Sequence, residues 1–206
     1  MKRLAILGAS GHGKVVAETA SQCGWQNIVF FDDAWPKLQS NSRWPVVGNT
    51  QKLITQLLDF DGVIVGIGNN HVRLAKTRHF QALYAPLIAL VHPSAVVSDT
   101  VLLGAGSVVF AGAVIQIDSQ LGDACIVNTR ASVDHDCLLS DGVHICPGVA
   151  LAGGVTVGEA SWVGIGASVK QLVNIGSNVT VGAGAAVIRD IPGDQIVIGV
   201  PARTIY

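Results

Sequence analysis

The hydrophobic pattern in the second half of the chain repeats every six residues. Beginning at Val91, every sixth residue is aliphatic, without a break in register up to Val187. The residues at this first repeat position are Val91, Val97, Leu103, Val109, Ile115, Leu121, Val127, Val133, Leu139, Ile145, Leu151, Val157, Val163, Val169, Ile175, Val181 and Val187. A period of six fits neither an α-helix nor a simple strand. It predicts a triangular parallel β-helix, in which three repeats make one coil and each repeat supplies a short strand and a corner.

Two more repeat positions support this prediction. The fifth position is small or aliphatic, as at Cys125 and Cys137, and the second is often glycine. We expect the aliphatic side chains to stack inside the β-helix, so that each coil is stabilised by its neighbours. We expect the second-position glycines to give the backbone freedom at the corners. The cysteines then act as small buried side chains. Because no C-x-x-C pair is present, a structural zinc site is not expected.

The first ninety residues alternate between strand and helix patterns. The predicted strands are residues 2–8, 28–32, 63–67 and 87–91, and the predicted helices are residues 13–23, 51–58 and 71–83. Such alternation predicts a Rossmann-like α/β domain with a small parallel sheet, interrupted by an irregular loop around residues 36–45. We therefore divide the chain into the Rossmann-like domain at 1–90, the β-helix at 91–192 and a C-terminal tail at 193–206.

Charge and hydropathy narrow the possible partners. The formal net charge is −1, from thirteen basic and fourteen acidic residues, so neither nucleic acid nor an anionic membrane is an expected partner. The most apolar stretch, residues 101–115, is shorter than the roughly 20 residues of a membrane-spanning helix. The basic start lacks the long apolar core of a signal peptide. We expect a soluble, cytoplasmic protein.

A glycine-rich turn, GASGHGKV at residues 8–15, follows the first predicted strand. Its spacing resembles a P-loop, but Val15 stands where a P-loop has the serine or threonine that binds magnesium. The glycines also do not match the dinucleotide-binding fingerprint. A glycine turn at a helix N-terminus suits a phosphate or pyrophosphate. It is equally well explained as a tight turn that serves packing alone.

Two further segments end strands of the same sheet. FFDD, residues 30–33, ends the second strand, and GIGNN, residues 66–70, ends the third. Ligands bind to sheets of this type at the carboxyl ends of the strands. The acids of the first segment suit hydrogen bonds from a ribose or base, and the glycine of the second allows close approach. Together with the glycine turn, they predict a ligand site.

The segment VDHDC, residues 133–137, is conspicuous because charge is scarce in the repeats. His135 is third in its repeat and should face outward between Asp134 and Asp136. A carboxylate beside one ring nitrogen fixes the tautomer and raises the basicity of the other. A solvated surface histidine is the alternative.

His144 lies half a coil away, so a trimer of such β-helices can bring His135 and His144 of neighbouring chains together. Histidines on a β-helix also permit a metal site, as in the γ-class carbonic anhydrases, but their ligand spacing is not evident here.

The motifs GASGHGK, FFDD, GIGNN, NTRASVDHDC and GVPAR together resemble bacterial sugar-nucleotide acetyltransferases of the hexapeptide-repeat superfamily. The resemblance covers essentially the whole chain. It extends to the UDP-4-amino-sugar N-acetyltransferases of N,N′-diacetylbacillosamine biosynthesis, and perosamine N-acetyltransferases and sialic acid O-acetyltransferases are similar. It implies a left-handed β-helix, a homotrimer, a nucleotide sugar on the N-terminal domain, and acetyl-CoA along the β-helix between subunits. No metal is expected.

The resemblance also implies roles for individual residues. His135 is the general base and Asp136 orients it. His144, Ile165 and Ala183 contact acetyl-CoA, and Arg203 suits a CoA phosphate by its charge. The residues implied in binding the nucleotide sugar are Ser10, Gly11, His12, Asp32, Asp33 and Gly68. Two departures stand out, because some relatives have a glutamate in place of Asp136 and a glycine in place of Ala183.

The predicted reaction is transfer of the acetyl group of acetyl-CoA to the amino group of a nucleotide-linked 4-amino-sugar, for bacterial glycan biosynthesis. The sequence leaves the nucleotide open between UDP and dTDP. One alternative is O-acetylation of a sialic acid, which uses the same fold and base. The other is a non-catalytic, nucleotide-binding scaffold.

Overall fold

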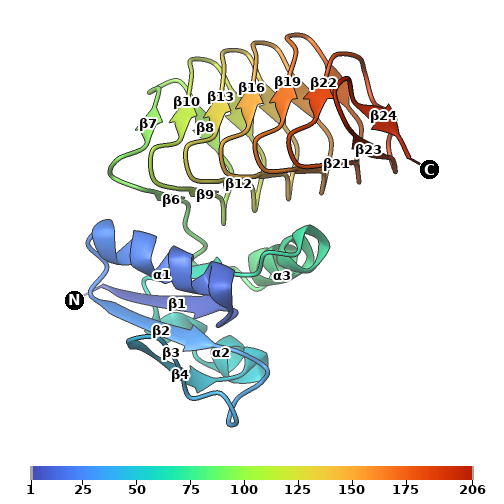
Figure 1. Ribbon diagram of the computed structural model, residues 1–206. Helices are drawn as coiled ribbons and strands as arrows, with labels where there is room; N and C mark the ends of the chain where they lie inside the picture. Colours follow the sequence, from blue (N-terminus) through green and yellow to red (C-terminus); the bar gives the residue numbers. More distant parts are fainter. Residues whose placement is uncertain (1, 206) are drawn as a thin grey trace.

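The computed structural model describes residues 2–205; Met1 and Tyr206, the outermost residues of the predicted first and last segments, lie outside the described residues. Figure 1 shows an N-terminal α/β unit beneath a β-helix whose axis runs roughly parallel to the first helix. Within residues 2–205, none of the helices combines the length and the hydropathy needed to cross a membrane.

The N-terminal sheet has the strand order β3-β4-β2-β1-β5. Strand β3 is antiparallel to β4, and the other pairings are parallel. The three strands β1, β2 and β5 confirm the predicted parallel sheet. The elements are β1 (Arg3–Leu7), α1 (Gly11–Gln22), β2 (Asn27–Phe31), β3 (Ser40–Asn41), β4 (Trp44–Gly48), α2 (Thr50–Thr55), the 3₁₀ turn η1 (Leu57–Asp59), β5 (Gly62–Val65) and α3 (Asn70–Ala82).

Two predictions about this unit were wrong. The segment 36–45, expected as an irregular loop, contains β3 and the start of β4, which pairs with β2. The prediction missed β4 because this strand contains Pro45, and a proline inside an apolar run argues against a central strand. The expected strand 87–91 is divided: Leu87 makes only an isolated bridge to Val63, whereas β6 (Leu90–Val91) belongs to the β-helix. The chain passes from one unit to the other at this point.

The β-helix has seventeen two-residue strands, β6 to β22, and each ends at the aliphatic first position of its repeat. Paired strands lie one coil, eighteen residues, apart, as in Val127 and Ile145, so the predicted register is confirmed. The sheet beneath which the N-terminal unit packs is called the docking sheet. It holds β6, β9 (Val108–Val109), β12 (Ile126–Val127), β15 (His144–Ile145), β18 (Trp162–Val163), β21 (Thr180–Val181), β23 (Ile196–Ile198) and β24 (Arg203–Thr204).

Two other sheets close the prism. The expected tail 193–206 supplies β23 and β24, which extend the docking sheet rather than leaving it. The second sheet holds β7 (Val96–Val97), β10 (Val114–Ile115), β13 (Ser132–Val133), β16 (Ala150–Leu151), β19 (Ser168–Val169) and β22 (Ala186–Val187). The third sheet holds β8 (Leu102–Leu103), β11 (Gln120–Leu121), β14 (Leu138–Leu139), β17 (Thr156–Val157) and β20 (Asn174–Ile175).

The expected role of the second-position glycines was also wrong. Positive φ angles occur at the fourth repeat position, for example 54° at Ala124, 59° at Asp136 and 69° at Gly142. Second-position glycines such as Gly104 are needed for another reason, since a Cβ there would overlap the backbone of Gly122 in the next coil. Close contact between coils, rather than freedom at the corner, therefore selects glycine at this position.

The buried apolar side chains form one cluster inside the β-helix and another that joins the N-terminal unit to it. The stacked aliphatic positions form one continuous cluster along the β-helix, and it includes the free, buried Cys125 and Cys137. A second cluster runs from β1 through α1 to Phe110 and Ile126 on the docking sheet. This shared cluster fixes the N-terminal unit on one side of the β-helix, so their functional residues have defined relative positions.

Candidate active site

His135 follows β13 at a corner between the second and third sheets. Its side chain is 57% exposed, and its Nδ1 lies 2.7 Å from Oδ2 of Asp136. Asp134 Oδ1 accepts a hydrogen bond from the His135 backbone N–H at 2.9 Å, so the two acids have different partners. The hydrogen bond to Asp136 is the largest cause that raises the pKa of His135 above its ordinary value. With Nδ1 bound to Asp136, Nε2 is available to accept a proton.

Gly153 lies one coil after His135 and was not predicted as a site residue. A Cβ at Gly153 would lie 2.5 Å from Cε1 and 2.6 Å from Nε2 of His135. The ring therefore rests against the backbone of the next coil, where only glycine leaves room. The eighteen-residue spacing between 135 and 153 was the sequence signal that would have identified it.

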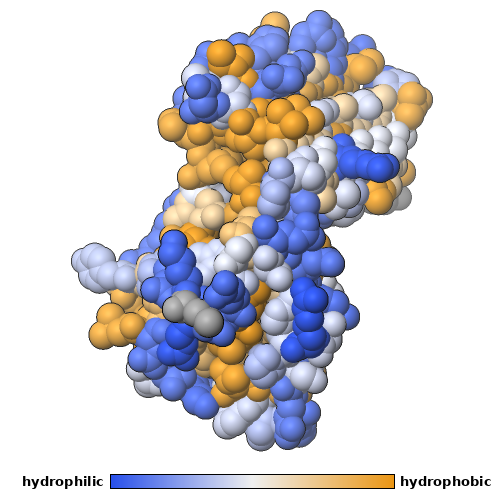
Figure 2. Space-filling view, turned by 90° about the vertical axis from the view of Figure 1, so that its left-hand side faces the viewer, coloured by the Kyte–Doolittle hydropathy of each residue, from blue (hydrophilic) through white to orange (hydrophobic). Residues whose placement is uncertain are grey.

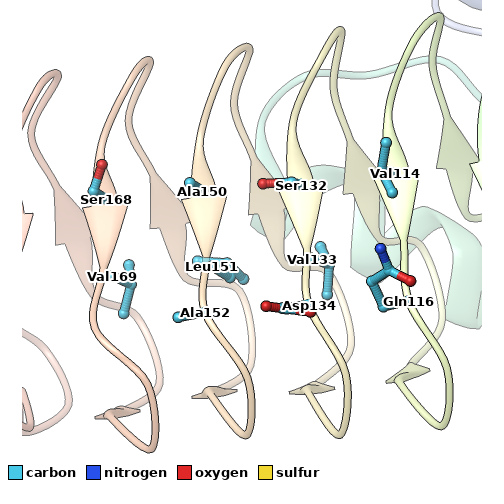
Figure 3. A pocket seen from close by; sticks show the side chains of 10 residues that line it. All are labelled: Val114, Gln116, Ser132, Val133, Asp134, Ala150, Leu151, Ala152, Ser168 and Val169. Atoms are coloured by element: carbon cyan, nitrogen blue, oxygen red, sulfur yellow. The ribbon is translucent and has the colours of Figure 1, made fainter.

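Two open hollows meet beside this histidine. One, of about 460 Å³, is lined by the His135 corner together with Gly153, Gln171 and Leu172. The other, of about 350 Å³, crosses the second sheet, and Figure 3 shows its small side chains Ser132, Ala150 and Ser168 on successive strands. Asp134 lines both hollows. An extended ligand on this face has access to His135.

A third cavity, of about 310 Å³, lies at the carboxyl ends of the N-terminal strands. It brings together Ser10, Asp32 and Asp33, as their positions at the turn and strand end predicted. Sequence reasoning missed three other lining residues, Thr50, Val72 and Lys76. Their signal was weak, because they lie on helices α2 and α3 and not directly after a strand.

The two acids in this cavity differ in their partners. Asp32 accepts hydrogen bonds from the backbone N–H groups of Ala9 and Ala34, at 2.8 and 2.9 Å, and so braces the glycine turn. Asp33 accepts one from the N–H of Thr50 at 2.8 Å, which is the largest cause that lowers its pKa. Asp33 Oδ2 lies 3.9 Å from Lys76 Nζ, and its side chain is 66% exposed. Asp33 is thus the acid more available to a ligand.

Some glycines in and beside the turn are required by close packing, whereas Gly11 has open space beside it. Gly8 has a φ of 105°, and a Cβ at Gly13 would overlap the carbonyl of Gly8. A Cβ at Gly66 would lie 2.9 Å from the Cα of Gly13. Packing therefore accounts for these three glycines. Gly11 has open space on its Cβ side, at the start of α1, where the backbone N–H groups of the first turn point outward.

His12 and His144 meet at the boundary between the two units. Their ring centroids are 6.4 Å apart, and His12 also packs edge-on against Phe110. His144 Nε2 lies 3.1 Å from Asn128 Nδ2. Among residues 2–205, His12 Nε2 and His144 Nδ1 are buried without a hydrogen-bond partner. Burial is the main cause that lowers the pKa of His12 to about 4 and that of His144 to about 3, so both rings are neutral near pH 7.

The remaining predicted residues are dispersed. Gly68 lies beside His12, since its Cβ position is 3.8 Å from the His12 Cβ. Ile165 and Ala183 are exposed at corners between the docking and second sheets, and the bond from Gly184 N to Ile165 O links their coils. Arg203 lies in the exposed strand β24. Within the described residues, no three His, Cys, Asp or Glu side chains gather where a metal ion would bind.

Comparisons with known proteins bear on the family and the class of reaction. Residues 3–80 match the family described as the PglD N-terminal domain. The acetyltransferase domain of PglB from Neisseria gonorrhoeae, solved in complex with acetyl coenzyme A, is 45% identical, with 99% of each chain covered and a TM-score of 0.95. PerB from Caulobacter crescentus, solved with CoA and GDP-perosamine, is 40% identical over 100% of this chain and 98% of that one, with a TM-score of 0.95.

A more distant relative also spans the whole chain. The GDP-perosamine N-acetyltransferase of Escherichia coli O157:H7 is 27% identical over 98% of this chain and 96% of its own. The family match at the N-terminus and the full-length likeness to acetyltransferase structures indicate the same family. The chain belongs to the acetyl-CoA-dependent sugar N-acetyltransferases in which a PglD-type N-terminal domain precedes a β-helix of six-residue repeats.

Proposed function

We propose that the chain acetylates the amino group of a nucleotide-linked 4-amino-sugar, with His135 as the general base. The observation that carries the proposal is the 2.7 Å contact between His135 Nδ1 and Asp136 Oδ2, with the ring otherwise exposed beside open hollows. The relatives act on UDP- and GDP-linked sugars by name, so the nucleotide is one of these or dTDP.

The cavity at the strand ends is the proposed nucleotide site. Asp33 suits an N–H of the base or a ribose hydroxyl, and Lys76 suits a phosphate oxygen. Ser10 and Gly11 belong to the turn along which a diphosphate would lie, at the start of α1, and Asp32 holds that turn through the N–H of Ala9. His12 and Gly68 lie on the side toward the β-helix, where the sugar would be directed. In this proposed order, the amino group rather than the nucleotide would lie near the acetyl donor.

In the proposed reaction, the amino nitrogen attacks the thioester carbonyl of acetyl-CoA while His135 Nε2 takes one of its protons. The C–S bond then breaks, the CoA sulfur leaves, and the protonated His135 returns the proton to it. Asp136 stabilises the cationic ring through Nδ1. Neutral His144 would lie at the acetyl end of CoA, and Ile165 and Ala183 would line the path of the rest of the cofactor. Holding both substrates together supplies much of the acceleration.

The same placement supports a homotrimer. The N-terminal unit packs below the docking sheet, whereas His135 occupies a corner between the other two sheets. A sugar bound beside His12 would therefore meet His135 of a neighbouring chain rather than its own. Exposed apolar side chains outside the core, including Val96, Leu102 and Leu138, suit contacts between chains. Figure 2 shows apolar surface on the β-helix, and further apolar patches among the polar side chains of the N-terminal unit.

The test is CoA release from acetyl-CoA with a panel of acceptors: UDP-, GDP- and dTDP-linked 4-amino-sugars, and free and CMP-linked sialic acid. We expect release with one nucleotide amino sugar, loss of about 10²-fold or more in His135→Ala, and retained activity in His71→Ala, which removes an exposed helix histidine. Release only with sialic acid would replace this proposal with O-acetylation. Release that persists in His135→Ala would remove His135 as the base, and no release with any acceptor would favour the scaffold.

A further inference from the structure

Arg73, on α3, is a buried cation without a carboxylate partner. Its side chain is 1% exposed, and it forms none of the ion pairs found among residues 2–205. Burying a charge is costly unless hydrogen bonds satisfy it. Burial is the main cause that lowers the pKa of Arg73 to about 10, so the guanidinium still carries its charge near pH 7. Since burying this charge is costly, we looked for what the guanidinium holds in place.

Every N–H of the guanidinium is used. Arginine has five such donors in a rigid, planar fork. Two of them reach carbonyls in the segment GIGNN, two reach corner carbonyls of the β-helix, and one reaches a side chain on α3. The five bonds run from Nη1 to Ile67 O (3.1 Å) and Gly68 O (2.9 Å), from Nε to Ala124 O (2.8 Å), and from Nη2 to Gly142 O (2.8 Å) and Asn70 Oδ1 (3.0 Å).

The acceptors on the β-helix form a ladder. Ala124, Gly142 and Ala160 occupy the same corner position in three successive coils, between the third and docking sheets. Arg73 binds the carbonyls of the first two, and Asn70 Nδ2 binds that of Ala160 at 2.9 Å. The start of α3 is therefore fixed to a rigid stack, and through Arg73 the preceding loop is fixed to it as well.

We propose that Arg73 is a positioning residue, which fixes the loop bearing Gly68 to the β-helix and so sets where the amino sugar lies relative to the acetyl donor. This inference rests on the proposed function, since Gly68 and its neighbour His12 are proposed sugar contacts. A lysine offers three donors from a single point and cannot reach both the loop and the corners. The guanidinium also lies close enough to His12 and His144 to contribute to their lowered pKa values.

Leu74 provides a matched control for a purely structural role. It is the next residue on α3, is 4% exposed, and packs against the corner at Gly142. Its apolar side chain makes no hydrogen bond to the loop. Leu74→Ala should lower the melting temperature, because it removes apolar packing from the same helix and the same boundary between units, without moving Gly68.

The experiment compares Arg73→Lys, Leu74→Ala and the wild type in their KM for acceptor, KM for acetyl-CoA, and amide hydrogen exchange of residues 66–70. We expect Arg73→Lys to raise the acceptor KM about tenfold or more, to leave the KM for acetyl-CoA within about twofold, and to speed exchange in the loop. Leu74→Ala should lower the melting temperature and leave both KM values unchanged. An acceptor KM in Arg73→Lys that equals that of Leu74→Ala would overturn the proposal.

The two proposals fail in different ways. If wild-type protein acetylates no acceptor, the proposed function is wrong, and hydrogen exchange then decides the role of Arg73 alone. Faster exchange at residues 66–70 in Arg73→Lys than in Leu74→Ala would sustain the positioning role. Equal protection of the loop in both variants would reject it.

Discussion

His135 and His144 lie nine residues apart on the same β-helix, yet their surroundings shift their pKa values in opposite directions. His135 occupies an exposed corner, where Asp136 binds its ring and raises its pKa. His144 lies on the docking sheet, where burial beneath the N-terminal unit lowers its pKa to about 3. One ring is thus suited to accept a proton, and the other to remain neutral beside a substrate.

The position in the repeat explains the difference. His135 is third in its repeat, at the corner, where the backbone turns and side chains reach solvent. His144 immediately precedes the aliphatic Ile145 and points outward from a flat sheet that another unit covers. The scaffold therefore sets the chemistry of a histidine by whether a corner or a covered sheet presents it.

The largest effect is expected from Gly153→Ala, which acts on the exposed side. The added methyl group would collide with the His135 ring and displace it from Asp136. The φ of Gly153 is not in the positive range, so alanine itself fits the backbone there. We expect kcat to fall by about 10²-fold or more, with little change in melting temperature.

A double-mutant cycle controls for indirect effects of Gly153→Ala. If the methyl group acts through His135, adding Gly153→Ala to His135→Ala should cost nothing further in rate. A second loss of similar size in the double variant would show that Gly153 acts on something other than the ring.

A smaller effect is expected from Asp136→Asn. Asparagine tolerates the positive φ of 59° at this corner, so the backbone should remain in place. Loss of the carboxylate removes the main cause of the raised pKa of His135. Since the base must be neutral to act, the acid limb of the kcat/KM profile should move to lower pH, and the plateau should fall by about tenfold.

Asp134→Asn is the matched control for this change. Asparagine retains an oxygen for the His135 backbone N–H and leaves the bond to Asp136 intact. Its acid limb should lie between that of the wild type and that of Asp136→Asn. If the Asp134 variant showed the larger shift, Asp136 would not be the acid that governs the ring.

The sequence predicted the β-helix well because its signal is repeated. Each coil provides the same inward positions, so an aliphatic register from Val91 to Val187 leaves little choice of fold. The N-terminal sheet has no such redundancy. A single residue, Pro45, was enough for the prediction to miss β4. The strand expected at 87–91 was divided between the two units, which local patterns cannot distinguish.

The candidate site was predictable where function follows from local geometry. Residues directly after strands, such as Asp33, and an outward histidine between acids could be identified from their spacing. Arg73 and Lys76 could not, because each acts on a segment distant in sequence. Gly153 could have been found only by stepping one coil, eighteen residues, on from His135. A buried arginine with five carbonyl and amide acceptors leaves no trace in a local pattern that distinguishes it from a solvated helix residue.

On the covered side, the expected effect is on stability rather than on rate. The pKa of His144 falls from 6.5 to about 3 on folding, so the unfolded chain binds a proton that the folded one does not. This contribution to the free energy of unfolding is complete above pH 6.5 and is lost as pH falls, by about 1.4 kcal/mol per pH unit. His12, with a pKa lowered to about 4, adds a loss of the same sign.

Urea unfolding between pH 7 and pH 5 measures this pH dependence of the free energy of unfolding. Most carboxylates titrate below that pH range. In His144→Gln, the free energy of unfolding should fall less steeply with decreasing pH than in the wild type. His135→Ala should keep the wild-type slope or steepen it slightly, because a raised pKa contributes stability below 6.5 that is lost as pH rises. Equal slopes for His144→Gln and the wild type would mean that His144 becomes protonated within the folded protein. The contrast between the two histidines would then not hold.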